Sequence, residues 1–533
     1  MGTFLNRGIH EFESAVNSLI YVDKTDMIDY FNKLINTEQR YACISRPRRF
    51  GKTMTANMLA AYYEKGSDSR KLFENQKIGK IDNWDVNLNK YDVIRIDIAD
   101  INSVQGNPQA ALDYIERVLI EELEYAYPGM LDENSITIVD ALDRINQRTG
   151  AQFVIIIDEW DAFFRDEKNN HQIEKRYVDL LRGLFKGNRS KSFIALAYIT
   201  GILPIKKYNS ESALNNFREY TMLSPKKLKK YIGFNEDEVS ELCKEYDMDY
   251  DEVCAWYDGY SFSGNEHVFG PNSVVQAMLD GNCENYWSQT VAFNSLATYI
   301  TMNFDGLKDA IIDMMAGVPA KVDVLSYQND MTSFKSKDDV MTLLIHLGYL
   351  CYDAETETAY IPNKEVRQIF ERSLKTMGWE EVIESIDKSE NLMKAVIEGD
   401  EQAVANGVEE CHRQNVSILK YNDENSLAMT IGLAFYSARK DYKLVRELPS
   451  GEGFADMVFI PKWKSNNKPV IVVELKWDKS AETAITQIKN KKYPDGLSQL
   501  SADEKIILVG ISYERDGKEG DKKHMCRIEV LRG

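Results

Sequence analysis

The chain has 533 residues, of which 44% are hydrophobic and 28% charged, and its formal net charge is −19. This length exceeds what one hydrophobic core supports, so we expect roughly two to four domains. The composition is that of an ordinary globular protein. The acidic balance argues against a protein that coats nucleic acid indiscriminately, but it is compatible with a local basic groove because charge is screened within about 10 Å.

Hydropathy and cysteine usage suggest where the chain works. No stretch approaches the ~18 apolar residues of a membrane span, and residues 1–13 lack the apolar core of a signal peptide. The seven cysteines are scattered without a Cys-x-x-Cys pair, and the six histidines are also dispersed. This pattern favours free thiols and argues against a His/Cys metal cluster. We therefore expect a cytoplasmic protein that makes no membrane contact.

The strongest motif lies in residues 41–63, YACISRPRRFGKTMTANMLAAYY. An apolar strand is followed by an Arg/Pro-rich loop, and Gly51-Lys52-Thr53 then opens a segment with helical apolar spacing. In this geometry backbone N–H groups hold a nucleotide phosphate, the lysine reaches the β- and γ-phosphates, and the threonine binds Mg²⁺. The match to G-x-x-x-x-G-K-[ST] is incomplete, because Arg46 stands where the first glycine is expected.

A second acidic motif follows a strand predicted at 91–98 and a helix at 108–127. Residues 152–161, QFVIIIDEWD, read as a buried parallel strand that ends on Asp158 and Glu159. Open α/β sheets place their ligand chemistry at the carboxyl ends of strands. We expect Asp158 in the Mg²⁺ shell and Glu159 beside the attacking water. The alternative is a buried strand whose Asp caps a helix, and the upstream phosphate loop weakens it.

Later segments leave more alternatives open. The strand at 192–200 ends on Thr200, which either senses the γ-phosphate or only terminates the strand. The basic run 225–230 reads as a solvated helix face more than as a nucleic-acid contact. The aromatic block 256–260, WYDGY, reads as a turn that packs a domain junction. Residues 291–378 give a winged-helix-like order of elements with an acidic wing, which favours protein packing over DNA reading.

A second chemical centre is predicted near the C-terminus. Strand 454–460 carries Asp456 among apolar residues, and strand 469–477 carries Glu474 and Lys476. Because alternate residues of a strand face the same side, Glu474 and Lys476 project together, and Asp456 meets them if the strands are neighbours. Two carboxylates suit Mg²⁺ or Mn²⁺, and the lysine can orient or deprotonate water, which is the equipment for phosphodiester hydrolysis. The alternative is a solvated salt bridge at a sheet edge, and the apolar run 470–473 argues against it.

The N-terminal part resembles the bacterial AAA-ATPase-like family. Its Val-Asp-Lys-Thr motif stands at 22–25, its Ile-Asp-Glu-x-Asp strand end at 157–161 and its Trp-Tyr-Asp-Gly-Tyr block at 256–260. Its phosphate loop is matched by Pro47, Arg48, Arg49, Phe50, Gly51, Lys52 and Thr53. The family shares the departure at Arg46, so the resemblance implies an ATP site with Mg²⁺ despite the missing glycine.

The C-terminal part resembles the PD-(D/E)xK nuclease superfamily, whose helix–three-strand–helix–strand core fits residues 423–512. The signature falls on Asp456, Glu474 and Lys476, with Gln487 in the following helix and Glu424 as a helix-borne acidic ligand. The two resemblances cover most of the chain. They imply a P-loop ATPase fused to a nuclease and point to defence or mobile-element biology.

We therefore predict an α/β multidomain protein in which ATP binding and hydrolysis control a metal-dependent nuclease acting on DNA or RNA. The predicted parts are a P-loop ATPase domain with a parallel sheet (1–222), a helical lid (223–290), a winged-helix-like domain (291–378), a helical linker (379–422) and a restriction-endonuclease-like α/β domain (423–533). The rival interpretation is a nucleotide-dependent switch whose nuclease-like domain does not cut. A P-loop kinase is a third, but no acceptor site is apparent. Self-association and an arginine that completes the ATP site in trans (Arg48, Arg49 or Arg218) are left open.

Overall fold

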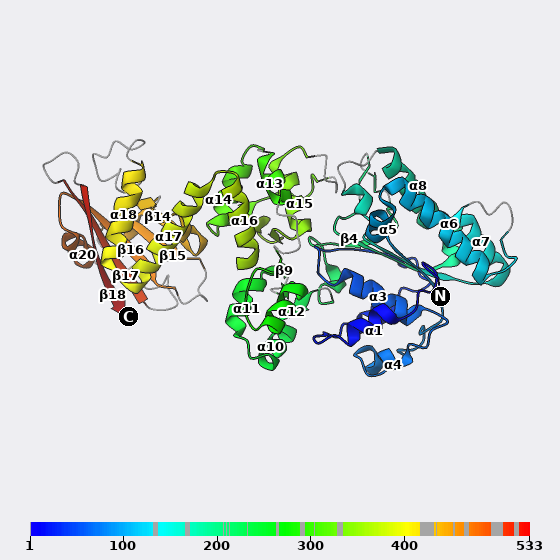
Figure 1. Ribbon diagram of the computed structural model, residues 1–533. Helices are drawn as coiled ribbons and strands as arrows, with labels where there is room; N and C mark the ends of the chain where they lie inside the picture. The colour runs from blue at the N-terminus through cyan, green and yellow to red at the C-terminus, as the bar shows by residue number, and fades with distance from the viewer. Residues whose placement is uncertain are drawn as a thin grey trace. The chain divides into compact units, whose positions relative to one another are not determined.

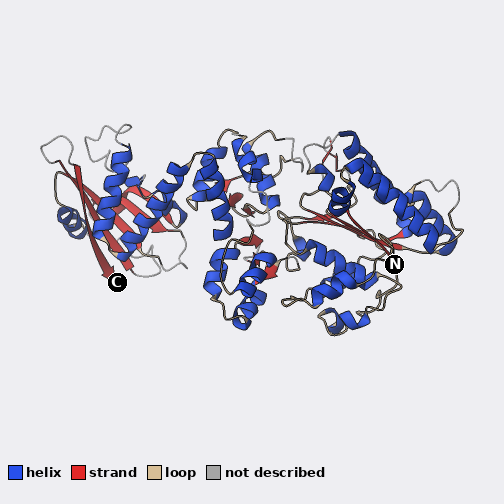
Figure 2. Cartoon of the chain, in the orientation of Figure 1, coloured by secondary structure: helices blue, strands red, loops and turns tan. Residues whose placement is uncertain are grey.

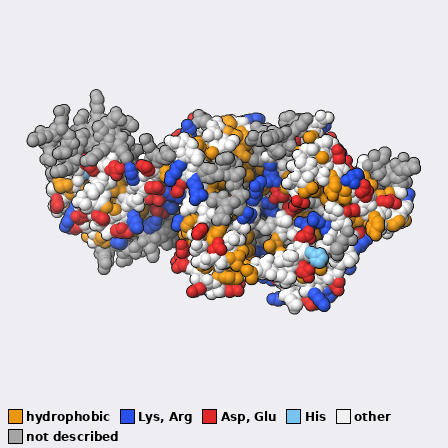
Figure 3. Space-filling view, viewed as in Figure 1, with side chains coloured by type: hydrophobic (Ala, Val, Ile, Leu, Met, Phe, Trp, Pro, Cys, Tyr) orange, Lys and Arg blue, Asp and Glu red, His pale blue; other side chains and the backbone are white. Residues whose placement is uncertain are grey.

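The structure is a computed structural model (Figures 1 and 2). In it the chain forms two compact units. It describes residues 2–131, 137–165, 171–205, 207–208, 211–212, 214–231, 233–262, 266–287, 294–302, 304–327, 334–415, 431–432, 434–450, 453–462, 468–491, 505–515 and 522–532. The N-terminal unit comprises Met1–Gly306 and Lys321–Ile369, and the C-terminal unit comprises Leu307–Ala320 and Phe370–Gly533. On the face seen in Figure 3, acidic and basic side chains are interspersed over each unit.

The N-terminal unit is built on a parallel sheet in the order β2-β3-β4-β1-β7. Its strands are β1 (Tyr41–Ser45), β2 (Asp92–Asp97), β3 (Phe153–Asp158), β4 (Ile194–Gly201) and β7 (Arg218–Tyr220). Strands β1, β3 and β4 are buried along their whole length, as expected for parallel strands covered on both faces. The predicted α/β class and parallel sheet are confirmed.

Helices cover both faces of this sheet (Figure 1). They are α1 (His10–Val16), α2 (Met27–Asn32), α3 (Lys52–Tyr63), α4 (Arg70–Phe73), α5 (Ile98–Gln105), α6 (Pro108–Ala126), α7 (Ile138–Thr149), α8 (His171–Lys186) and α9 (Ser190–Phe193), with short 3₁₀ turns η1 (Ile78–Lys80) and η2 (Ala162–Phe164). Helices α5 to α8 lie over one face, and α1, α3 and α4 lie on the other. The sheet and helices α5 to α8 share one apolar core.

A helical subdomain, residues 234–287, follows the sheet in the chain. It contains β8 (Phe234–Asn235), α10 (Glu236–Glu245), α11 (Tyr250–Tyr257), β9 (Tyr260–Phe262), β10 (Glu266–Phe269) and α12 (Pro271–Asp280), and it has its own core. Just before it, the basic run forms the 3₁₀ turn η3 (Lys226–Leu228) with Leu228 buried and Lys226, Lys227 and Lys230 exposed. This placement agrees with a solvated face.

The rest of the N-terminal unit contains two helices, a hairpin and the start of a further helix, in the predicted order. The elements are α13 (Asn294–Thr301), α15 (Lys337–Leu347), β12 (Cys351–Asp353), β13 (Thr358–Tyr360) and α16 (Lys364–Thr376). Helix α15 ends at Gly348, whose φ of 86° is the left-handed conformation typical of a helix C-cap. Strands β12 and β13 pair antiparallel across the acidic turn.

The C-terminal unit is a five-stranded mixed sheet in the order β14-β15-β16-β17-β18, in which only β16 and β17 are parallel. The strands are β14 (Tyr442–Ser450), β15 (Gly453–Pro461), β16 (Val470–Trp477), β17 (Lys505–Arg515) and β18 (Lys522–Arg532). Helix α20 (Ala481–Asn490) packs on one face. The predicted α/β fold of this domain is confirmed, while β18 was not predicted.

Helices α17 (Glu380–Glu398) and α18 (Glu401–Asn415) cover the other face of this sheet. They lie in the segment that the sequence assigns to a linker, but Leu392, Val396 and Val408 share a core with Met457 and Val473. Their apolar stripes are therefore part of the C-terminal unit. The helix predicted to start at Glu424 lies mostly outside the described residues. Among those residues, no helix is long and apolar enough to cross a membrane.

Candidate functional site

The phosphate loop joins the end of β1 at Ser45 to the start of α3 at Lys52. Arg49 and Gly51 adopt left-handed backbone conformations, with φ of 66° and 76°. A Cβ atom on Gly51 would meet nothing within 4 Å, so the glycine is favoured by its backbone angle and not by lack of space. The loop thus turns sharply into a 12-residue helix, whose N-terminus is suited to an anion.

Lys52 is buried inside this loop. Its Nζ donates to the carbonyl oxygens of Arg46 and Pro47 at 2.9 and 2.8 Å and lies 4.0 Å from Glu159 Oε1. Burial lowers the pKa of Lys52, and the nearby carboxylates, chiefly Glu159, oppose that shift. The ammonium is held by two neutral carbonyls, which a phosphate can replace with a stronger charge-assisted interaction.

Arg46 explains how the loop forms without its first glycine. Its side chain is fully buried, donates through Nη1 to the carbonyls of Ser45 and Tyr220, and lies 5.6 Å from the ring centroid of Phe262. Burial lowers the pKa of Arg46 to about 10. The guanidinium therefore packs against neighbouring strands and does not line the cavity in front of the loop.

Asp158 ends β3 directly behind the start of α3. It is fully buried, and its Oδ2 has no partner with hydrogen-bond geometry among the described residues. Burial raises the pKa of Asp158 to about 6, while the nearby Thr53 hydroxyl lowers it. An orphan carboxylate oxygen beside a threonine hydroxyl fits Mg²⁺, which prefers hard oxygen ligands.

Glu159 is in a left-handed conformation, with φ of 51°, and faces the phosphate loop. It forms a short ion pair with Arg165, whose Nε also lies 3.6 Å from Asp161 Oδ2. Burial alone would raise the pKa of Glu159, but Arg165, Lys52 and Arg48 outweigh it and hold the pKa below its usual range. The carboxylate is therefore ionised at neutral pH.

Thr200 and two unpredicted residues complete this strand edge. Thr200 is fully buried at the end of β4, beside β1, and its carbonyl accepts from Trp160. Asp97 ends β2 in register with Asp158, and burial raises its pKa. Asp97 and Arg165 line the cavity, but the sequence analysis did not select them as site residues. Asp97 had a signal, since it lies next to the end of the predicted strand 91–98, whereas nothing in the sequence separates Arg165 from a surface arginine.

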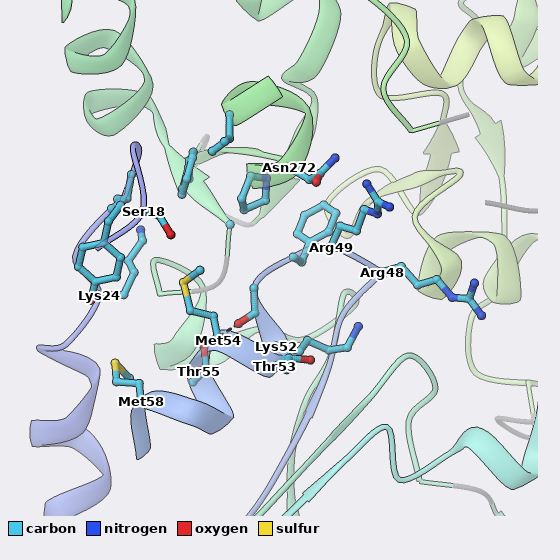
Figure 4. A pocket seen from close by; sticks show the side chains of 18 of the residues that line it. Ser18, Lys24, Arg48, Arg49, Lys52, Thr53, Met54, Thr55, Met58 and Asn272 are labelled. Atoms are coloured by element: carbon cyan, nitrogen blue, oxygen red, sulfur yellow. Dashed lines mark hydrogen bonds between the residues drawn. The ribbon is translucent and has the colours of Figure 1, made fainter. Parts of the chain in front are cut away.

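A cavity of about 1020 Å³ opens in front of the loop. Of the predicted residues, those lining it are Arg48, Arg49, Phe50, Gly51, Lys52, Thr53 and Glu159, whereas Pro47, Asp158 and Thr200 lie behind its wall. In Figure 4, Arg48 and Arg49 extend on one side of the loop, and Met54, Met58, Ser18 and Lys24 lie on the other. Ile20 and Val22, which lie between Ser18 and Lys24 in the chain, pack with Phe234 and Val275, and all four line the cavity. The second side is therefore largely apolar.

The aromatic block 256–260 packs behind the phosphate loop, as predicted for a junction. Tyr260 is buried, donates to the carbonyl of Gly348 at 2.7 Å and meets the Phe50 ring edge-on at 5.2 Å. A Cβ atom on Gly348 would lie 2.7 Å from Pro47 Cγ. The loop thus packs directly on the end of α15, and this supports its shape from behind.

In the C-terminal unit, the structure brings the predicted nuclease residues together on neighbouring strands β15 and β16. Asp456 Oδ2 accepts from the Leu475 N–H at 2.7 Å, and Lys476 Nζ donates to Glu474 Oε1 at 3.0 Å. Gln487, on α20, makes a short hydrogen bond to the same Glu474 oxygen. Helix α20 comes this close because Gly510 on β17 has no side chain, and a Cβ there would lie 2.4 Å from the Ala481 carbonyl oxygen.

The electrostatics of this second site suit a divalent cation. Burial, followed by the charge of Asp456, raises the pKa of Glu474 to about 7, and Lys476 lowers it. Glu474 Oε2 and the hydroxyl of Ser512, which lies opposite Lys476 on β17, are buried without hydrogen-bond partners among the described residues. Such orphan oxygens fit Mg²⁺ or Mn²⁺. The proposed further ligand Glu424 lies outside the described residues.

Two family models match the chain. Residues 6–209 match the model described as predicted AAA-ATPase, and residues 422–523 match that of the PD-(D/E)XK nuclease superfamily. The chain therefore carries an AAA-ATPase-like domain at its N-terminus and a PD-(D/E)XK nuclease superfamily domain at its C-terminus.

Similar proteins are distant. An uncharacterized protein in the vnfD 5′ region of Azotobacter chroococcum mcd 1 is 25% identical over 339 residues, which span 62% of this chain and 60% of that protein. Cdc6p from Pyrobaculum aerophilum is 12% identical with a TM-score of 0.26, covering 68% of this chain and 98% of its own. Aeropyrum pernix ORC2 in its ADPNP–ADP complexes is 11% identical with a TM-score of 0.30 and the same coverage. Likenesses this low say nothing about what the present chain binds.

Proposed function

We propose that the N-terminal unit binds ATP with Mg²⁺ and hydrolyses it. The observation that carries this proposal is the meeting of Lys52 and Glu159, 4.0 Å apart, in a cavity with a helix N-terminus at one end and an apolar wall at the other. Arg48 and Arg49 are exposed at the cavity mouth and form no ion pair within the described part of the chain. Phosphates fit the first end, and a planar base fits the second.

The residues divide the work of hydrolysis as follows. Lys52 exchanges its two carbonyl partners for the β- and γ-phosphates, and the backbone N–H groups of residues 48–53 hold the phosphate oxygens. Thr53 and Asp158 hold Mg²⁺, which when bound neutralises charge on the phosphates. Glu159 orients the attacking water and accepts its proton, and Thr200 supports this edge from within β4.

We further propose that the C-terminal unit hydrolyses nucleic-acid phosphodiesters, of DNA or RNA. Asp456 and Glu474 hold the metal, which when bound polarises the phosphate and lowers the pKa of its water. Lys476, which donates to Glu474, would orient the attacking water, and Gln487 would position the Glu474 carboxylate. We propose that the first activity controls the second, since one chain carries both domains.

A second candidate function is a nucleotide-dependent switch whose C-terminal unit binds partners without cutting. The formal net charge of −19 favours it, because an acidic protein is repelled by nucleic acid. The retention of Asp456, Glu474 and Lys476 in one cluster opposes it. Self-association and cytoplasmic location stay predictions.

The ATPase proposal is tested by Glu159→Gln. We expect hydrolysis to fall by about 10²- to 10⁴-fold, because the amide cannot accept the proton, while ATP affinity stays within about threefold. Phosphate release and isothermal titration calorimetry measure the two quantities. The matched control is Glu38→Gln, whose carboxylate forms an exposed pair with Lys191. Hydrolysis by Glu159→Gln at the rate of the control would refute the role of Glu159.

A further inference from the structure

The Val-Asp-Lys-Thr motif at 22–25 has no part in the chemistry proposed above, yet it runs along the cavity. Residues 18–24 form one wall of the apolar end, and we call this segment the strap. The opposite wall comes from the helical subdomain, through Phe234, Val275 and Leu279. The polar side chains of the motif form the hydrogen bonds and the ion pair that hold these two walls in place.

Asp23 and Thr25 fasten the strap to the body of the ATPase domain. The N–H and hydroxyl of Thr25 donate to Asp23 Oδ1 at 2.8 and 2.7 Å. Asp23 Oδ2 accepts from the Lys77 N–H at 2.5 Å, and the Ile78 N–H donates to Thr25 Oγ1 at 3.0 Å. Thr25 is fully buried. Both residues therefore tie the strap to the segment that begins η1.

Lys24 extends instead to the helical subdomain. Its Nζ lies 2.6 Å from Glu238 Oε2 and donates to the Lys230 carbonyl at 2.8 Å. The side chains of Lys24 and Glu238 are only 14% and 11% exposed. Glu238 is also the third residue of α10, where it accepts from the Asn235 N–H at 3.0 Å in a capping box. One carboxylate therefore fixes the start of α10 and receives the strap lysine.

We propose that the Lys24–Glu238 pair is a clasp that holds the helical subdomain against the strap and sets the width of the apolar end of the cavity. Its ligand is the base end of a nucleoside triphosphate, while the phosphates stay at Lys52. The inference rests on the proposed ATP site. Removing Lys24 leaves the buried Glu238 carboxylate with a more distant and half-exposed partner, Lys77 at 3.8 Å, so the wall is expected to move or loosen.

The geometry separates this role from phosphate binding. Asp23 and Thr25 anchor the strap without Lys24, so loss of the lysine removes the ion pair to the helical subdomain and leaves the strap in place. The phosphate loop also has support from outside the helical subdomain, because Pro47 packs against Gly348 at the end of α15. Clasp variants should therefore weaken ligands that carry a base and spare ligands that are phosphate alone.

The test is calorimetric titration of the full chain with ATP and with inorganic pyrophosphate, both with Mg²⁺. We expect Lys24→Met to weaken ATP at least tenfold, with pyrophosphate affinity within twofold of wild type, and Lys24→Arg to restore ATP binding to within threefold. Glu238→Gln keeps an acceptor for the capping box and is expected to behave as Lys24→Met. The matched control is Lys77→Met, whose Nζ is 3.8 Å from Glu238 Oε1 but 49% exposed.

Each outcome has a distinct meaning. If both Lys24→Met and Glu238→Gln bind ATP as wild type does, or lose pyrophosphate by the same factor as ATP, the clasp is overturned while the ATP site stands. If wild type binds pyrophosphate as tightly as ATP, the base end contributes nothing and the clasp is again overturned. If wild type binds neither, the proposed ATP site fails and the clasp fails with it.

Discussion

Replacing Lys52 with alanine is expected to weaken ATP binding by about 10- to 100-fold and to slow hydrolysis by a further factor of about 10²–10³. Lys52 is the one buried cation within the described phosphate loop that faces Glu159, and it is held only by two carbonyl oxygens. Without it, the charge that builds up on the γ-phosphate has no partner from α3. Titration calorimetry and phosphate release measure the two effects.

Lys33→Ala is the control for this experiment, because Lys33 is 69% exposed and, among the described residues, pairs only with Asp29 one helical turn away. Its ATP affinity and hydrolysis should equal those of wild type. Wild-type hydrolysis by Lys52→Ala would contradict the assignment of the phosphate loop.

The second large effect concerns the metal at Asp456 and Glu474. With the pKa of Glu474 raised to about 7, protons compete with the metal below that pH. Mn²⁺ affinity of the nucleotide-free protein should therefore be constant above pH 7 and fall by up to about tenfold per unit below it. Glu474→Gln should bind Mn²⁺ weakly, without pH dependence between 6 and 8.

The same shift has a consequence for stability. The folded pKa of Glu474, about 7, lies above the ordinary value of 4.5, so the folded state binds more protons between these values. The metal-free C-terminal unit should lose stability as pH rises from 4.5 to 7, by up to roughly 3 kcal/mol, and added Mn²⁺ should reverse the loss. Glu482→Gln, an exposed change on α20, is the control for this stability measurement.

For the metal-binding measurement, a Mn²⁺ affinity that is the same at pH 6 and pH 8 would contradict the proposed metal site.

Much of the fold could be predicted because local sequence carries the signal. Strands β1, β3 and β4 are nearly continuous apolar runs. Such runs are typical of a parallel sheet that is covered by helices on both faces. The same runs placed Lys52 and Glu159 at one edge, since carboxyl ends of parallel strands meet there. Likewise, alternation along β16 put Glu474 and Lys476 on one side.

The rest depends on contacts between residues far apart in the chain. The clasp joins Lys24 to Glu238, 214 positions away, and no local pattern pairs them. Arg46 looks like a defect in the phosphate motif until its burial against Tyr220 and Phe262 is seen. Strand β18, KKHMCRIEVLR, begins with charged residues and lies at the sheet edge, so its apolar alternation is weak.

Control of a nuclease by the ATP site is measured in cleavage assays. Labelled single- and double-stranded DNA and RNA are incubated with Mn²⁺, with and without ATP, using wild type, Asp456→Ala and Lys52→Ala. We expect wild type to cleave at least one substrate at a rate that ATP changes severalfold. We also expect that Asp456→Ala does not cleave and that Lys52→Ala cleaves without responding to ATP. Absence of cleavage under every condition, or cleavage by wild type that ATP leaves unchanged, would contradict it.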